Sequence, residues 1–203
     1  QAGIGDLTVV IGPRPGSVRA ALTELEPPPQ WAVQPEAAGS ADAVRTALHG
    51  RDFDIALVAP GDCFVTPPDL RAVLAPLLEG DAEAALLTAP LEGEAPGDWI
   101  GVRTQNDCVV RLEGHPRGGT RRSTGICAFR ASHLRWFRDN PGVMQSVPVG
   151  GMPPAESILE QSLQMMVEAG IELVAVPCRG PFVDVDKPWH ILAAHRAAAR
   201  WRL

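Results

Sequence analysis

Short, unbroken apolar runs that end at turn residues are the main pattern of this chain. Residues 55–59 read Ile-Ala-Leu-Val-Ala, and Pro60-Gly61 then breaks the run. A run of this length is typical of a strand covered on both faces, as in a parallel sheet. The pattern therefore predicts a central strand with Asp62 just past its carboxyl end, the edge at which open α/β sheets bind ligands.

Strand-like runs alternate with helical spacing through the first half of the chain. Strands are predicted over residues 7–11, 31–33, 55–59 and 84–89, and helices over about 17–25, 40–50 and 70–78. This alternation favours an α/β fold with a doubly wound, mostly parallel sheet and right-handed crossovers.

The second half has a different pattern, richer in short alternating strands. Residues 99–103 and 108–112 predict two strands around a turn at 105–107. A helix is predicted over residues 156–169, a strand over 171–176, and a last helix from Trp189 to the end. We therefore expect one domain across residues 1–203, whose second half carries a β-rich section.

Composition and charge narrow the function classes. The 203 residues are 45% hydrophobic and 21% charged, with a net charge of -6, which argues against a general nucleic-acid binder. No apolar run approaches the roughly 20 residues that span a bilayer, so no membrane partner is expected. The isolated cysteines, without a CxxC pair, suit reduced thiols in a cytoplasm better than a zinc site: Cys63, Cys108, Cys127 and Cys178.

The turn at Gly61-Asp62 is the first candidate for chemistry. An ionised carboxylate at the carboxyl edge of a sheet can hold Mg²⁺, which binds oxygen ligands and usually keeps substrate phosphates in its shell. A plain turn residue or helix cap explains Asp62 equally well on this stretch alone.

Two further stretches, in order along the chain, support the chemical interpretation. Residues 33–44 contain Gln34 and Gly39-Ser40, and residues 182–189 contain Asp184 and Asp186. Together with the Gly-Asp turn they resemble the sugar nucleotidyltransferases, also called nucleotide-sugar pyrophosphorylases. This resemblance implies a Rossmann-like nucleotidyltransferase fold and transfer of a nucleotidyl group from UTP or dTTP to a sugar 1-phosphate, with release of pyrophosphate.

The resemblance assigns roles to residues of both halves. It implies a nucleotide half over residues 1–90, in which the binding residues are Gln34, Gly39, Ser40, Gly61 and Asp62. Asp62 and Asp184 match the two catalytic carboxylates that hold Mg²⁺, whereas Asp186 stands where a glycine is common. A glutamine amide both donates and accepts, so Gln34 suits the edge of a uracil or thymine ring.

The resemblance also implies a sugar half over residues 91–190. Its sugar-binding positions match Gly101, Glu113, Ser123, Thr124 and Gly125. The family's usual Glu-Lys-Pro is Glu-Gly-His-Pro here, without the lysine, and its usual asparagine is Ser123. An arginine can supply the missing charge on a sugar phosphate, and the candidates are Arg117, Arg121 and Arg122.

Alternatives remain open. The family's first strand and Gly-rich phosphate loop are expected to precede Gln1, and without them a chain that starts there would be poorly soluble or inactive. A catalytically inactive module of the same fold that binds a nucleotide or sugar phosphate is therefore the main alternative. A cytidylyltransferase of lipid or cofactor pathways is a third class, disfavoured by the Gln34 segment and the long sugar section. A homo-oligomer is possible, and the sequence names neither the sugar nor the base.

Overall fold

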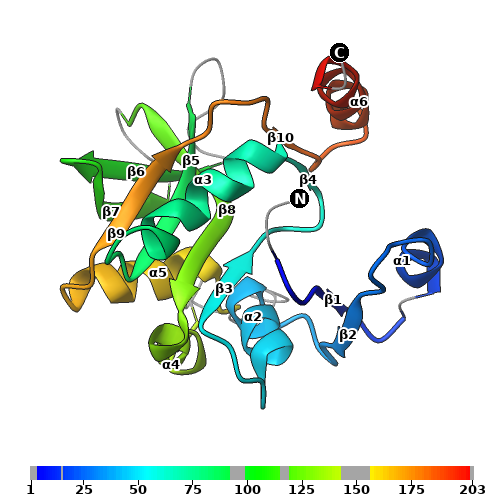
Figure 1. Cartoon of the computed structure of the whole chain (residues 1–203), viewed down its shortest axis with the longest axis horizontal. Coiled ribbons are helices and arrows are strands. Elements are labelled where there is room, and N and C mark those ends of the chain that lie inside the picture. Colours follow the sequence, from blue (N-terminus) through cyan, green and yellow to red (C-terminus); the bar gives the residue numbers. More distant parts are fainter. Residues whose placement is uncertain (1–3, 15, 92–98, 115–118, 143–155, 202–203) are drawn as a thin grey trace, which may run out of the picture. The chain divides into compact units, whose positions relative to one another are not determined.

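The computed structural model describes residues 4–14, 16–91, 99–114, 119–142 and 156–201 (Figure 1). The strands are β1 Thr8–Ile11, β2 Gln30–Val33, β3 Ile55–Val58, β4 Cys63–Phe64, β5 Ala84–Pro90, β6 Ile100–Gln105, β7 Cys108–Gly114, β8 Arg121–Arg130, β9 Leu173–Pro177 and β10 Val183–Asp184. The helices are α1 Gly16–Ala21, α2 Ser40–Leu48, α3 Pro67–Leu78, α4 Leu134–Arg138, α5 Leu159–Glu168 and α6 His190–Trp201, with a 3-10 turn at Ala131–His133. The predicted strands and helices occur in the predicted order, but the first helix is shorter than expected, and the strands β4, β8 and β10 were not predicted.

The chain forms two compact units. The described parts of residues 3–52 and 134–162 form one unit, and those of 53–133 and 163–203 form the other. This division does not follow the boundary near residue 90 between the two functional halves, which remain a prediction. Among the described residues, no helix combines the length and the apolar character that crossing a membrane requires.

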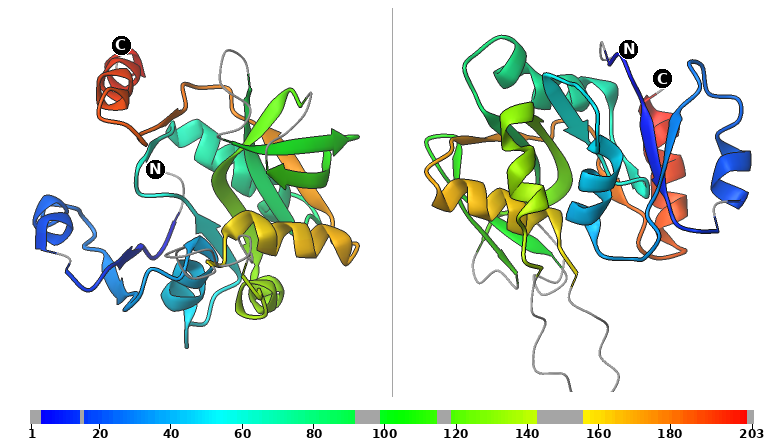
Figure 2. Two further views of the ribbon diagram at one scale, coloured as in Figure 1. Left: turned by 180° about the vertical axis from the view of Figure 1, so that it is seen from behind. Right: turned by 90° about the horizontal axis from the view of Figure 1, so that it is seen from below.

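A six-stranded sheet dominates the second unit, with the order β3-β8-β5-β9-β7-β6 (Figures 1 and 2). Among the described strands of this sheet, only the β5–β9 pair is parallel. Strand β8 lies between β3 and β5 and is antiparallel to both. The protein is a mixed α/β fold, and the prediction of a doubly wound, mostly parallel sheet is wrong. An unbroken apolar run reports that both faces of a strand are covered, and this holds equally for a central strand with antiparallel neighbours.

The core of this sheet explains the apolar runs. Leu86 and Leu87 are adjacent in β5 and both are fully buried, so the sheet is covered on both faces at that strand. On one face α3 packs against β5, β8 and β9 through Val73, Leu74 and Leu77. Burying three such side chains stabilises this layer by roughly 1.5–3 kcal/mol each.

The strand β8 also closes the sheet back toward β6. Gly101 in β6 pairs with Arg122 in β8, in addition to the pairing of β6 with β7. The bulge in β8 lies between the residues that face Leu86 and Thr88, and it coincides with Gly125 at a φ of 72°. These irregularities bend β8 so that its first residues reach two different neighbours.

A second, two-stranded sheet carries the residues after β3 and β9. The strand β10 is antiparallel to β4, with Asp184 opposite Cys63 and Val183 opposite Phe64. Helix α6 follows β10 and contacts both short strands. The chain thus brings a segment near residue 62 and a segment near residue 184 together at one place in the second unit.

The first unit contains a parallel pair, β1–β2, and the helices α2 and α4. Helix α2 begins at Ser40, as predicted, and its N-cap Gly39 has a φ of 101°. A Cβ atom at Gly39 would lie 2.4 Å from the backbone oxygen of Ser157. The local packing of this unit therefore requires a glycine at this position.

Candidate active site

The turn after β3 and the strand β10 bring two carboxylates together. Pro60-Gly61 ends β3, and the backbone N–H of Val185 donates to the carbonyl oxygen of Asp62 at 2.8 Å. Asp184 pairs with Cys63, and Asp62 directly precedes Cys63. Asp62 and Asp184 therefore lie on neighbouring segments of the β4–β10 sheet. The structure therefore juxtaposes the two residues that the sequence predicted as metal ligands.

The two carboxylates share an electrostatic environment. Burial raises the pKa of Asp184, and the negative charge of Asp62 raises it further. The charges of Arg122 and His190 act in the opposite direction on Asp184, and Asp186 adds a smaller upward shift. Mutual repulsion of this kind is relieved by a cation placed between the oxygens, so the pair fits a hard divalent ion such as Mg²⁺. No cluster of three or more potential metal-ligating side chains occurs within the described ranges.

The charges of Asp62 and Asp184 also act on the thiol of Cys63. Burial raises the pKa of the Cys63 thiol to about 11, and Asp62 and Asp184 contribute to this shift. Its Sγ donates to the carbonyl oxygen of Pro60 at 3.2 Å. Cys63 is thus a neutral thiol at physiological pH and is not suited to act as a nucleophile.

Asp186 has a different environment. It is exposed, and its carboxylate accepts from the Nζ of Lys187 at 2.5 Å. The hydrogen bond and charge of Lys187 hold the pKa of Asp186 below its usual value. Of the two candidate carboxylates in this segment, Asp184 is the one coupled to Asp62.

Gly125 and Pro60 lie in close contact beside this turn. A Cβ atom on Gly125 would lie 2.8 Å from Cγ of Pro60, and the positive φ of Gly125 independently disfavours other residues. Gly125, predicted as a sugar-binding residue, therefore also sets the position of the turn that carries Asp62.

The other predicted sugar-binding residues hold the strands of this region together. Gly101 pairs with Glu113 and Arg122 on either side, and Glu113 accepts from Nε of Arg103 at 2.7 Å. Thr124 Oγ1 donates to the carbonyl oxygen of Leu87 at 2.8 Å. Ser123 Oγ accepts from the backbone N–H of Gly125 at 3.0 Å. These contacts leave the sugar-binding roles as predictions and show a structural use for each residue.

Of the three arginines considered for the sugar phosphate, two can be placed. Arg121 donates to Thr88 Oγ1 at 2.8 Å and to the Thr88 carbonyl oxygen at 2.9 Å. Arg122 is buried and stacks on aromatic rings, with its guanidinium carbon 3.8 Å from the ring centre of Trp99 and 5.2 Å from that of Phe182. Arg117 lies outside the described residues.

The predicted base-recognition residues lie in the first unit. The Gln34 side chain donates from Nε2 to Asp42 Oδ2 at 2.7 Å and to the Gly39 carbonyl oxygen at 3.1 Å. Burial acts to raise the pKa of Asp42, but hydrogen bonds from Gln34 and Arg45 hold it below its usual value. Ser40 Oγ accepts from the backbone N–H of Leu159 at 2.8 Å.

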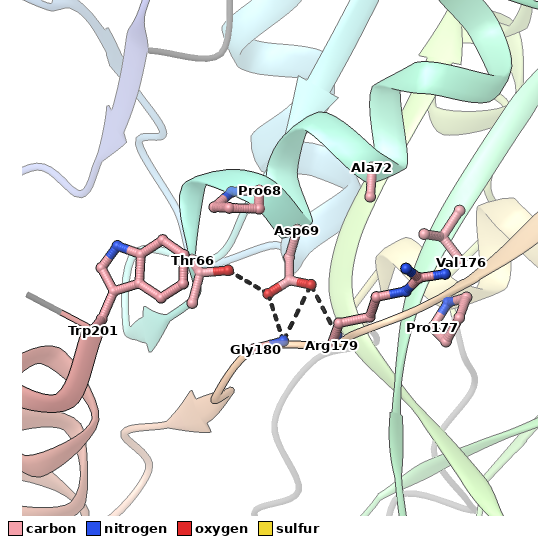
Figure 3. A pocket seen from close by; sticks show the side chains of 9 residues that line it. All are labelled: Thr66, Pro68, Asp69, Ala72, Val176, Pro177, Arg179, Gly180 and Trp201. Carbon is pink, nitrogen blue, oxygen red and sulfur yellow. Dashed lines mark hydrogen bonds between the residues drawn. The ribbon is translucent and has the colours of Figure 1, made fainter. Parts of the chain in front are cut away.

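A buried carboxylate anchors the loop that leads to Asp184 (Figure 3). Asp69, at the start of α3, is 2% exposed and accepts from the backbone N–H groups of Arg179 and Gly180 at 2.8 and 3.1 Å. Thr66 Oγ1 donates to the same carboxylate. A pocket lies beside this anchor, and Trp201 of α6 stands at one side of it (Figure 3). The anchor fixes the loop between β9 and β10 to the amino end of α3.

Solved structures of nucleotidyltransferases are similar to this chain over nearly its whole length. A protein from Bacillus anthracis described as a glucose-1-phosphate thymidylyltransferase, solved with sucrose, has a TM-score of 0.76 and 17% identity, and the match covers 98% of this chain and 78% of that one. The inositol-1-phosphate CTP transferase of T. maritima has a TM-score of 0.74 and 13% identity, with 97% and 77% covered. The nucleoside-diphosphate-sugar pyrophosphorylase of Vibrio cholerae RC9 has a TM-score of 0.70 and 14% identity, and the match covers 95% of this chain and 81% of that one. This chain has the sugar nucleotidyltransferase fold.

A sequence comparison also finds a curated relative of this chain. The chain is 33% identical over 115 residues to the bifunctional protein GlmU of Azorhizobium caulinodans, which is 55% of this chain but only 25% of that protein. The chain thus spans about a quarter of the length of the curated relative that it matches. No protein-family model matches the chain.

Within this nucleotidyltransferase fold, sequence reasoning missed three parts of the site. The sequence pattern assigns no site role to Asp69, just before the predicted helix at 70–78, to Trp99, in the predicted strand at 99–103, or to Phe182. An acidic residue after Pro-Pro at a helix start is typical of capping the helix's own N–H groups, whereas Asp69 accepts from the distant backbone of Arg179 and Gly180, which no local signal predicts. The stacking of Trp99 and Phe182 on Arg122 depends on pairings between distant strands and has no local signal.

Proposed function

We propose that this chain carries the nucleotidyl-transfer site of a sugar-1-phosphate nucleotidyltransferase that uses UTP or dTTP. The observation that supports this proposal best is the coupled pair Asp62 and Asp184 on adjoining short strands beyond β3. Two neighbouring carboxylates, of which Asp184 has its pKa raised by burial and by the charge of Asp62, suit a reaction in which two phosphate anions must meet.

In the proposed reaction a phosphate oxygen of the sugar 1-phosphate attacks the α-phosphorus of the triphosphate. An O–P bond forms to the α-phosphorus, the bond from the α-phosphorus to the bridging oxygen breaks, and pyrophosphate leaves with that electron pair. The attacking oxygen is already anionic, so no general base is needed. Asp62 and Asp184 are the proposed holders of Mg²⁺, which when bound offsets the charge of both substrates and stabilises the transition state.

Two further residues of the second unit, Gly125 and Asp69, hold the segments that carry Asp62 and Asp184 in position. Gly125 packs against Pro60 and sets the turn that presents Asp62. Asp69 holds the loop before β10, and thereby sets where Asp184 stands. In phosphoryl-type transfers most of the rate comes from such positioning and electrostatic stabilisation, because the protein contributes little covalent chemistry.

The proposed preference for uracil or thymine rests on the orientation of Gln34. Its Nε2 donates to the carboxylate of Asp42, which accepts only, so the amide orientation is defined. Oε1 is then the acceptor that Gln34 offers to a base. The ring N3–H of uracil or thymine can donate to such an acceptor.

The test is a pyrophosphate-release assay on the longest polypeptide that the gene encodes. We expect turnover with UTP or dTTP and a sugar 1-phosphate in the presence of Mg²⁺, and much less with CTP or purine triphosphates. A panel of sugar 1-phosphates and inositol 1-phosphate identifies the acceptor. Nucleotide binding without turnover on any acceptor would contradict the enzyme proposal and favour a binding module of the same fold.

A further inference from the structure

The side-chain amide of Gln34 is held on its nitrogen side. Gln34 directly follows β2, and its backbone N–H donates to the carbonyl oxygen of Ile11 at the end of β1, at 2.9 Å. Its side-chain Nε2 donates to Asp42 Oδ2 at 2.7 Å and to the Gly39 carbonyl oxygen at 3.1 Å. An amide nitrogen carries two hydrogens, and each of these two partners is an acceptor only. A base can therefore hydrogen-bond to this amide at Oε1 but not at Nε2.

Asp42 is itself fixed from its other side. It lies in the first turn of α2 and is 8% exposed. Its Oδ1 accepts from Nε of Arg45 at 3.0 Å and also from Nη2 of the same guanidinium, while Oδ2 accepts from Gln34. Burial acts to raise the pKa of Asp42, but the hydrogen bonds from Gln34 and Arg45 hold it below its usual value. The carboxylate is therefore ionised at neutral pH and offers Gln34 an acceptor only.

This arrangement excludes the opposite orientation of the Gln34 amide. A half turn of the amide would bring Oε1 against Oδ2 of Asp42 and against the carbonyl oxygen of Gly39, with an acceptor facing an acceptor at both contacts. Asp42→Asn would remove this constraint, because an amide offers a donor as well as an acceptor. The charge and chemistry at position 42 thus decide which end of Gln34 is presented to a ligand.

We propose that Asp42 is a positioning residue that determines base specificity, because it fixes the Gln34 amide so that this side chain only accepts a hydrogen bond from the nucleotide base. This inference rests on the proposed role of Gln34 in base recognition. It replaces the expectation that Gln34 both donates to the base and accepts from it, since the amide nitrogen is already in use. The base edge that meets Gln34 must then donate, as the N3–H of uracil or thymine does.

The experiment is a double-mutant cycle in nucleotide binding, measured by calorimetry on the longest polypeptide that the gene encodes. The ligand is UTP or dTTP, whichever the wild type binds more tightly. Asp42→Asn is expected to weaken binding at least about fivefold, which is roughly 1 kcal/mol. In a Gln34→Ala background the same substitution should change the Kd by less than about twofold, because its effect passes through the Gln34 amide.

Two control variants separate this role from a structural one. Arg45→Met breaks the ion pair of Asp42 but keeps the carboxylate that accepts from Gln34, so the Kd should stay within about twofold of the wild type. Asp139→Asn also removes a carboxylate paired with an arginine, since Asp139 accepts from Nε of Arg138 at 3.2 Å in the same unit. It should leave the Kd within about twofold as well.

Unchanged nucleotide binding by Asp42→Asn would overturn the proposal. Losses that simply add to those of Gln34→Ala would overturn it too, because Asp42 would then act independently of that amide. An equal loss in Arg45→Met would show that the ion pair matters rather than the acceptor. Should Asp42→Asn fail to fold, hydrogen exchange in the wild type decides: a Gln34 side-chain NH2 that exchanges at least about tenfold more slowly than that of an unfolded peptide supports a held amide, and exchange at the peptide rate contradicts it.

The outcome is separable from that of the proposed function, which turnover tests. An Asp42→Asn loss that disappears in the Gln34→Ala background, in a protein that releases no pyrophosphate, would keep the role of Asp42 and remove the enzyme proposal. Turnover together with additive losses would do the reverse. Binding of neither UTP nor dTTP would overturn both.

Discussion

Gly180→Ala probes the anchor that positions the β10 segment. A Cβ atom at Gly180 would lie 2.6 Å from Thr66 Cγ2 and 2.7 Å from both Thr66 Oγ1 and Asp69 Oδ2. The two side chains are 1% and 2% exposed and are hydrogen-bonded to each other, so they cannot move aside without breaking those bonds. The substitution must therefore push the loop away from the carboxylate or separate Thr66 from Asp69.

The magnitude follows from two terms. Overpacking a buried site costs typically about 1–3 kcal/mol. Weakening hydrogen bonds to a buried carboxylate adds about 1.5–3 kcal/mol for each bond that is lost. Partial relaxation leaves a net loss in the free energy of unfolding of roughly 2–4 kcal/mol. For a chain of this size the melting temperature should fall by about 5–15 °C.

The assay is urea and thermal unfolding of Gly180→Ala beside a matched control. Gly114→Ala is that control, because the nearest atom to a Cβ there is Ile100 Cδ1 at 4.0 Å. Asp69→Asn should resemble Gly180→Ala, since one of the two accepting oxygens becomes an NH2 group, which cannot accept a hydrogen bond. A Gly180→Ala protein within about 0.5 kcal/mol of the Gly114→Ala protein would show that the loop does not depend on this anchor.

Three further predictions concern the site itself. Asp62→Asn and Asp184→Asn should each lower kcat in the pyrophosphate-release assay by at least about a hundredfold, and near-normal turnover in either variant would remove that residue from the carboxylate pair. Gln34→Ala should weaken UTP or dTTP binding by roughly 1–3 kcal/mol in calorimetry and affect purine triphosphates less, and equal losses for both would place Gln34 away from the base. With a pKa of about 11, Cys63 should react with iodoacetamide at pH 8 on the order of a hundredfold more slowly than a free cysteine. Peptide mapping follows this labelling, and Asp62→Asn, which removes a charge that raises the pKa of Cys63, should speed it.

The sequence alone determined most of the elements and one part of the site. The run at residues 55–59 and the break at Pro60-Gly61 predict a buried strand that ends just before Asp62, and β3 ends at Val58. Helix α2 begins at Ser40 and the 84–89 run forms β5, as expected. These features are local, because apolar periodicity and turn residues act over a few positions and report which faces are buried.

The tertiary structure alone decided how the strands are arranged. Strand β8 inserts between β3 and β5 and runs antiparallel to both, although the apolar run of β5 is the same for either direction of its neighbour. Choice of partner and direction depends on long-range packing, which a local pattern does not encode.

The same long-range pairing assembled the site. Asp62 and Asp184 are 122 positions apart and meet through the register of β4 and β10, which a resemblance suggested but no spacing within the chain implies. Arg122 reaches Trp99 and Phe182 only because β6 folds back onto the start of β8. The sequence specifies which residues carry charge. Pairings between strands that are far apart in the chain decide how close these charged residues lie to one another, and the strength of their electrostatic interaction depends on that distance.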